Sequence, residues 1–203
     1  MKRYSYIAVV ALAMLCGAVA ARAATDPLEM IKTTTEAVTT RVAKEKEALR
    51  ADPGKTYELV SELIFPSFDF STIAPFVLGA EQWKAADEAR RKAFVEQFRK
   101  LMVRTYATAL LEYSDHPIRY PEGADVKDGT AFVKQEIVQP GGTPMVVSYR
   151  LSNKTGEWRV IEVVVDGVAL MKTYRGSFQG TVQEKGLDGL IADLTTKNAE
   201  LDK

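Results

Sequence analysis

The middle of the chain carries the pattern that most restricts its fold, because apolar residues there alternate with polar ones as in β-strands. Residues 130–138, 144–152 and 157–165 are rich in Val, Ile, Tyr and Phe. The turn-forming segments Pro140–Gly142 and Asn153–Gly156 separate them. Strands joined by such short turns form hairpins, so we expect an antiparallel sheet.

Two of these strands show which side chains face a core. The apolar face of the second strand carries Met145, Val147, Tyr149 and Leu151. Ser148 and Arg150 point away from that face. Strict alternation gives the third strand two apolar faces, one with Trp158, Val160 and Val164, the other with Ile161, Val163 and Val165. We therefore expect the third strand to be buried on both sides.

Apolar residues recur at helical spacing before and after the strands. The Asp-Pro pairs at 26–27 and 52–53 are typical helix starts, with an aspartate cap ahead of a proline. We expect a short third helix that ends at Gly79, a long fourth helix over residues 87–113, and further helix after Gly167. Helices separated along the chain from an antiparallel sheet indicate an α+β fold, and 203 residues favour a single domain.

The start of the chain has the pattern of a secretory signal peptide. Lys2 and Arg3 precede an apolar segment over residues 7–15, and Ala21–Ala23 fits a signal-peptidase site. The apolar segment is shorter than the roughly 20 residues that cross a bilayer. We therefore predict a cleaved leader at residues 1–23 and export to the periplasm.

Cleavage leaves a domain of residues 24–203 without cysteine, since Cys16 is the only one in the chain. Cys16 does not follow the pattern of a lipoprotein cleavage site, so we expect no lipid anchor. Cleavage also lowers the count of Lys and Arg from 27 to 24 against 27 Asp and Glu, which gives a net charge of −3. Binding to nucleic acid needs a basic face, so this charge argues against such a partner.

Residue types that carry metal or nucleophilic chemistry are scarce. His116 is the only histidine, and the sequence has no glycine-rich phosphate loop and no Gly-X-Ser-X-Gly motif. A zinc site and Cys or Ser-His catalysis are therefore excluded. We expect no metal and no enzyme activity.

Two carboxylates leave an alternative open. Asp69 lies between two phenylalanines, and Asp166 precedes Gly167 at the end of a strand. A buried aspartate with a raised pKa beside a tyrosine could shuttle protons, as isomerases do. The simpler interpretation is structural, with Asp69 as the cap of the helix that follows and Asp166 in an Asp-Gly turn.

Two ordered sets of residues extend across most of the chain. The first set is Phe68–Ala74, Val77–Gly79, Trp83, Phe94, Phe98, Leu101 and Tyr106. The second set is Trp158–Val160, Val163–Val168, Leu170, Tyr174–Arg175 and Phe178. Together they resemble the MlaC, or toluene-tolerance (Ttg2-type), family of periplasmic auxiliary proteins of ABC transport. Ala169 and Met171 depart from the family pattern but keep its apolar character.

The resemblance implies a twisted antiparallel sheet of about four strands packed against a helical layer, similar to the NTF2-like fold, with an apolar cavity. It implies a periplasmic carrier that binds phospholipid as cargo, uses no cofactor and acts as a monomer. Its expected partners are an inner-membrane ABC transporter with an MCE-domain subunit and an outer-membrane lipoprotein complex. Its expected role is to maintain outer-membrane lipid asymmetry. Hopanoid-associated relatives share the signature, so a polycyclic lipid stays open as cargo, and an envelope adaptor with a solid core stays open as a third function.

The expected lipid contacts lie on the sheet face that Ser148 and Arg150 do not share, and on the helices that cover it. From the sheet they are Val147, Tyr149, Val163 and Val165. From the helices they are Phe70, Ile73, Phe76, Tyr106, Leu110, Leu170 and Tyr174. Apolar residues between helices and a sheet are more often core than ligand contacts, so periodicity alone does not separate the two roles.

Overall fold

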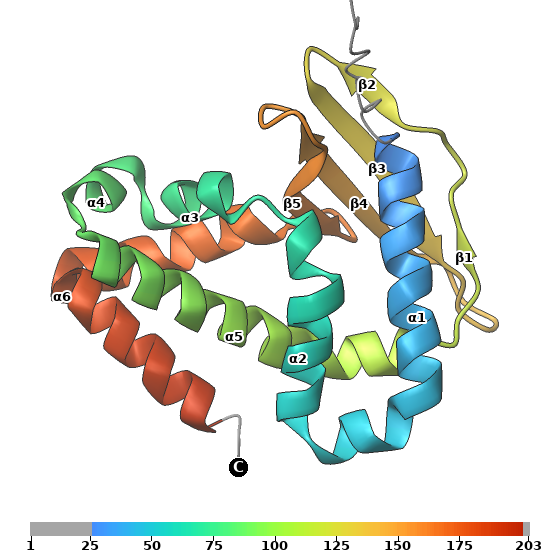
Figure 1. Cartoon of the computed structure of the whole chain (residues 1–203), viewed down its shortest axis with the longest axis horizontal. Helices are drawn as coiled ribbons and strands as arrows, with labels where there is room; N and C mark the ends of the chain where they lie inside the picture. The colour runs from blue at the N-terminus through green and yellow to red at the C-terminus, as the bar shows by residue number, and fades with distance from the viewer. Residues whose placement is uncertain (1–25, 201–203) are drawn as a thin grey trace, which may run out of the picture.

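The computed structural model describes residues 26–200, so the predicted leader at residues 1–23 lies outside the described residues. The helices are α1 (Pro27–Ala51), α2 (Pro53–Leu63), the 3₁₀ helix η1 (Phe65–Ser67), α3 (Phe70–Leu78), α4 (Ala80–Ala85), α5 (Glu88–Tyr113) and α6 (Leu170–Glu200). The strands are β1 (Ile118–Arg119), β2 (Asp125–Lys127), β3 (Thr130–Ile137), β4 (Met145–Ser152), β5 (Arg159–Val165) and β6 (Val168–Ala169). The order of helices, strands and a final helix confirms the predicted α+β class (Figure 1).

The sheet is antiparallel and has six strands in the order β1-β3-β4-β5-β6, with β2 also paired to β3. Its centre is the predicted set of long strands, β3, β4 and β5. The expected number was about four. The additional strands are only two or three residues long, too short to show alternation in a sequence.

The pairing register between β4 and β5 shows that one prediction was wrong, namely which side chains of β5 share a face of the sheet. Arg150 pairs with Glu162 while the next residue, Leu151, pairs with Val160, so Ile161 is an extra residue on β5. Such a β-bulge shifts the alternation by one position. Val160 and Val163 therefore share one face of the sheet, whereas strict alternation placed them on opposite faces.

Aspartate caps begin the helices where the sequence predicts them. The side chain of Asp26 accepts hydrogen bonds from the amides of Leu28 and Glu29 at 2.8 and 3.1 Å, and Asp52 accepts one from Gly54 at 2.9 Å. Gly79, with a φ of 96°, ends α3. A short helix that the sequence pattern did not predict, α4, follows directly.

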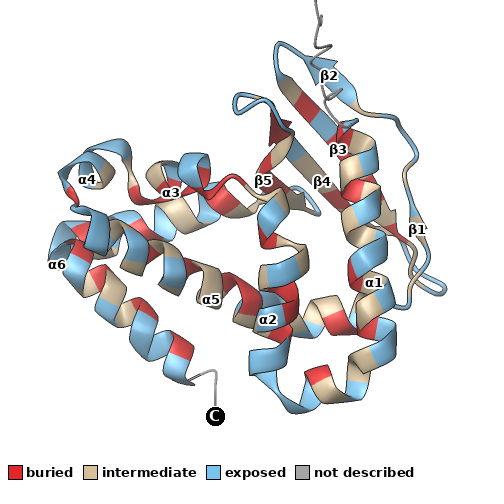
Figure 2. Ribbon diagram, viewed as in Figure 1, coloured by how far each residue is buried: buried red, intermediate tan, exposed pale blue. Residues whose placement is uncertain are grey.

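Apolar side chains form two separate cores. One lies among α2, α3, α5, α6 and the second half of α1. The other lies between the sheet and the first half of α1, which Figure 1 shows lying alongside β3 and β4. Buried residues follow the sides where these elements meet (Figure 2). Among the described helices, none contains a stretch long and apolar enough to cross a bilayer.

Candidate functional site

A cavity of about 310 Å³ lies between the two cores, within the size range of small-molecule sites. The helices α1, α2, α5 and the start of α6 form one side, and β3, β4 and β5 form the other. Both cores contribute wall residues, for example Phe65 and Met102 from the helical core and Val147 and Val160 from the sheet core. No Asp, Glu, Lys or Arg is among the described residues that line it.

The structure brings most of the predicted contact residues into this wall. The predicted residues that line the cavity are Tyr106, Leu110, Val147, Tyr149, Val163, Val165 and Leu170. Val163 and Tyr149 are cross-strand partners, as are Val165 and Val147, so they form a continuous patch on β4 and β5. Their contact with lipid stays a prediction, because the structure holds no ligand.

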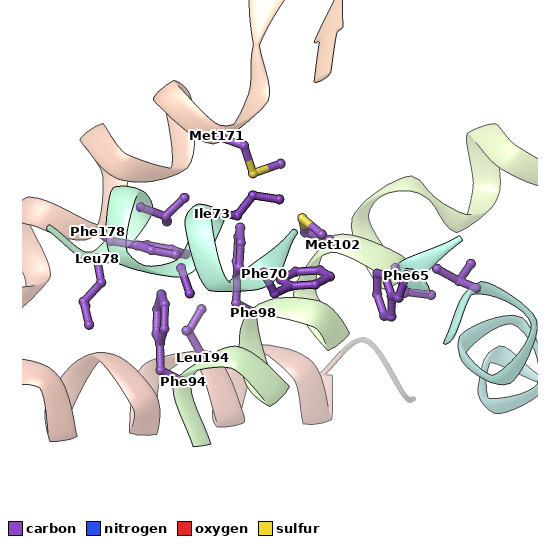
Figure 3. Close-up of a cluster of buried hydrophobic side chains, with 14 of the residues drawn as sticks. Phe65, Phe70, Ile73, Leu78, Phe94, Phe98, Met102, Met171, Phe178 and Leu194 are labelled. Carbon is purple, nitrogen blue, oxygen red and sulfur yellow. The ribbon is translucent and has the colours of Figure 1, made fainter. Parts of the chain in front are cut away.

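The remaining predicted residues lie outside the cavity wall. Phe70 and Ile73 are buried in the helical core, where Figure 3 shows them among side chains of α5 and α6. Tyr174 packs its ring edge to face against Phe98, with centroids 5.1 Å apart. Phe76 is 37% exposed, and the guanidinium of Arg175 lies 5.0 Å from its ring centroid. Phe70, Ile73 and Tyr174 belong to the helical core instead, because helical spacing marks a buried face without indicating which core buries it.

The helices α1 and α2 supply wall residues that sequence reasoning missed. Ile31 and Val38 of α1 face the cavity together with Thr34, Thr35 and Thr39. A narrow apolar stripe bordered by threonines is the signal that could have identified this face, since hydroxyls are rare inside a solid core unless they have a partner. The residues from α2 and the segment after it are Val60, Ile64, Phe65, Ser67 and Phe68.

A buried side-chain amide also lies in the wall, and the sequence analysis did not identify it either. Gln135 of β3 is only 4% exposed and lines the cavity. Its Oε1 accepts hydrogen bonds from the hydroxyls of Tyr149 at 3.3 Å, Tyr120 at 3.4 Å and Thr35 at 3.4 Å. Burial raises the pKa of the Tyr149 and Tyr120 hydroxyls, so both stay protonated donors at neutral pH.

The two candidate catalytic carboxylates bind backbone amides. Asp69 accepts a hydrogen bond from the amide of Thr72 at 3.1 Å and others from the hydroxyls of Ser71 and Thr72. Asp166 accepts a hydrogen bond from the amide of Val146 at 2.9 Å. Burial raises the pKa of Asp69, but the hydrogen bonds from Ser71 and Thr72 outweigh burial and lower it overall. A proton shuttle requires a raised pKa, so this lowered pKa favours the capping interpretation of Asp69 over the isomerase-like one.

The capping role of Asp69 gives a test. Asp69→Ala is expected to lower the free energy of unfolding by about 1 to 2 kcal/mol at neutral pH, because the amide of Thr72 loses its acceptor. Since the folded-state pKa is depressed, the contribution of Asp69 is present above its unfolded pKa of about 3.9 and is lost as the pH falls through the folded pKa. Urea unfolding of wild type and variant between pH 7 and pH 3 measures this difference.

The matched control is Asp125→Ala, because Asp125 is an exposed residue of β2. This change should alter the free energy of unfolding by less than about 0.5 kcal/mol. A gap between wild type and Asp69→Ala that stays constant down to pH 3 would contradict a role for the ionised carboxylate.

Comparison with known proteins identifies a family model and two related proteins that match this chain. The family model described as "MlaC protein" matches residues 32–196. The toluene tolerance protein ttg2D of Pseudomonas putida is 28% identical over 82% of this chain and 77% of its own length. The intermembrane phospholipid transport system binding protein MlaC of Haemophilus influenzae is 24% identical over 85% of this chain and 82% of its own.

A solved structure has the same architecture. It is a phospholipid-binding protein from Ralstonia solanacearum in complex with a phospholipid. That chain is 26% identical and superimposes with a TM-score of 0.79, over 88% of this chain and 99% of its own length.

Proposed function

Because the chain belongs to the MlaC family, we propose that it is a periplasmic carrier that binds the acyl chains of phospholipid in its cavity and leaves the head group in water. The observation that carries the proposal is the chemistry of the wall, which combines apolar side chains from two cores and, among its described residues, no charged one. The phospholipid bound in the Ralstonia solanacearum structure, and the phospholipid transport named for the Haemophilus influenzae relative, support the same cargo.

The physical chemistry of the cargo explains both the wall and the need for a carrier. Each methylene gains about 0.8 kcal/mol on leaving water, so two acyl chains with roughly 30 methylenes gain on the order of 24 kcal/mol. Free diffusion of such a lipid across an aqueous compartment is therefore negligible. A phosphate inside this cavity would lose its hydration, and the described wall residues include no cation to replace it, so the head group belongs outside.

The carrier role extends to partners at both membranes. We propose that the chain, exported by its leader, takes up phospholipid at one membrane complex and delivers it to another as a monomer. The proposed complexes are an outer-membrane lipoprotein assembly and an inner-membrane ABC transporter with an MCE-domain subunit. Such exchange would maintain the lipid asymmetry of the outer membrane.

Native mass spectrometry of the protein purified from periplasm tests the cargo. We expect a mass increment that equals one or more phospholipids, with the lipid identified by fragmentation after release. A polycyclic lipid in that increment would favour the hopanoid alternative. A folded sample in which no lipid is bound, even after incubation with phospholipid vesicles, would contradict the carrier proposal.

A further inference from the structure

The amide of Gln135 has unused hydrogen-bonding capacity inside the cavity. Its Oε1 accepts hydrogen bonds from Tyr149, Tyr120 and Thr35. Its nitrogen carries two N–H donors, and none of the described residues provides an acceptor for them. The side chain is 4% exposed, and the neighbouring inward residues of β3, Val133 and Ile137, are apolar. The nitrogen stays accessible to water inside the cavity that Gln135 lines. Acyl chains that fill the cavity would displace that water, so a ligand that supplies an acceptor here is favoured.

Gln135 and the hydroxyls of Tyr149, Tyr120 and Thr35 form a cluster, called here the Gln135 cluster. Its position indicates which part of a lipid it can reach. Tyr120 follows β1, at the edge of the sheet, and is only half-buried. The ammonium group of Lys32 lies 5.8 Å from the centroid of the Tyr120 ring, and the Lys32 side chain is 35% exposed. The Gln135 cluster therefore lies one aromatic side chain below the protein surface. With the head group in water at this edge, the atoms that connect the head of a lipid to its tails lie at the depth of Gln135.

The parts of a lipid differ in whether they can accept a hydrogen bond from the Gln135 amide. Acyl methylenes offer no acceptor, and the phosphate is an anion that the uncharged wall disfavours. The ester carbonyls that attach the tails to glycerol are neutral acceptors. We propose that the Gln135 amide donates a hydrogen bond to an ester carbonyl of the bound lipid. The hydroxyls of Tyr149, Tyr120 and Thr35 hold the amide in place. This inference rests on the proposed phospholipid cargo and adds a preference for ester-linked lipid.

A competition between two lipids tests the subsite. Wild type and Gln135→Met are incubated with vesicles of equimolar diester and diether phosphatidylcholine of equal chain length, and native mass spectrometry gives the ratio of the two bound lipids. Diether lipid lacks the carbonyls. Wild type is expected to prefer the diester lipid about fivefold, and Gln135→Met to bind both lipids with a preference below about twofold. Phe132→Leu, a change on the outer face of the same strand, is expected to keep the wild-type ratio.

Each result has a distinct meaning. Equal binding of the two lipids by wild type, or an unchanged preference in Gln135→Met, overturns the subsite and leaves the carrier proposal intact. Failure of wild type to bind either lipid counts against the carrier itself. Should Gln135→Met not fold, Tyr149→Phe removes one of the hydroxyls that position the amide and is expected to lower the preference as well. A wild-type ratio in that variant then overturns the subsite.

Discussion

Val163→Glu and Val147→Glu are each expected to reduce lipid loading by about a hundredfold or more, because several kilocalories per mole are needed to bury an unpaired carboxylate beside acyl chains. Both valines are buried, line the cavity and lie on the inner face of adjacent strands. In the empty protein water can enter the cavity and solvate the glutamate, so the fold should persist. Native mass spectrometry measures lipid loading from phosphatidylcholine vesicles, and circular dichroism shows whether each variant is folded.

Val126→Glu is the matched control for this prediction. Val126 lies in β2 and is 52% exposed, so the same substitution adds a carboxylate in water. We expect Val126→Glu to load lipid as wild type does. If the two cavity variants also load normally while folded, the acyl chains bind somewhere other than the sheet side of the cavity.

Phe98→Ala is expected to cost about 3 to 5 kcal/mol in the free energy of unfolding, as deletion of a fully buried aromatic ring usually does. Phe98 is completely buried in the helical core shown in Figure 3. Its ring stacks on Phe94 with centroids 5.9 Å apart, and it contacts Tyr174 and Phe178 edge to face at 5.1 and 5.8 Å. The loss removes these contacts together and leaves a void among three helices. Urea-induced unfolding measures the change.

Phe132→Ala provides the comparison, because Phe132 is 50% exposed on the outer face of β3. Its loss should change the free energy of unfolding by less than about 1 kcal/mol. If Phe98→Ala lowered the free energy of unfolding no more than Phe132→Ala does, the ring contacts of Phe98 would not stabilise the helical core.

Long elements were predictable because their own residues encode them. The strands β3 and β4 alternate over eight residues, β5 is rich in valine, and the caps Asp26 and Asp52 precede prolines. The short strands depend on pairing with distant neighbours, and α4 is only six residues long, so neither leaves a periodic signal. The bulge at Ile161 was missed for a related reason, since it is a property of two paired strands and not of one.

The candidate site, like the fold, was predictable only in part. The sheet side was predictable because alternation assigns Val147 and Tyr149 to one face. The helical side was predictable only in part. Tyr106, Leu110 and Leu170 line the cavity, whereas Phe70 and Ile73 have the same spacing but belong to another core. Gln135 left a readable signal, a polar residue at an inward position between Val133 and Ile137. A glutamine amide neither ionises nor acts as a nucleophile, so it does not belong to the residue types that mark catalytic or metal sites.

The extra residue at Ile161 affects the curvature of the cavity wall separately from the choice of side chains that line it. A bulge bends its strand and increases the local twist. Yet Val160 on one side of it and Val163 on the other still face the same way. Deleting Ile161 would therefore change the curvature of the wall without exchanging the side chains that the cargo meets. A change of one residue in the length of this strand can thus alter the shape of the cavity and keep its lining chemistry.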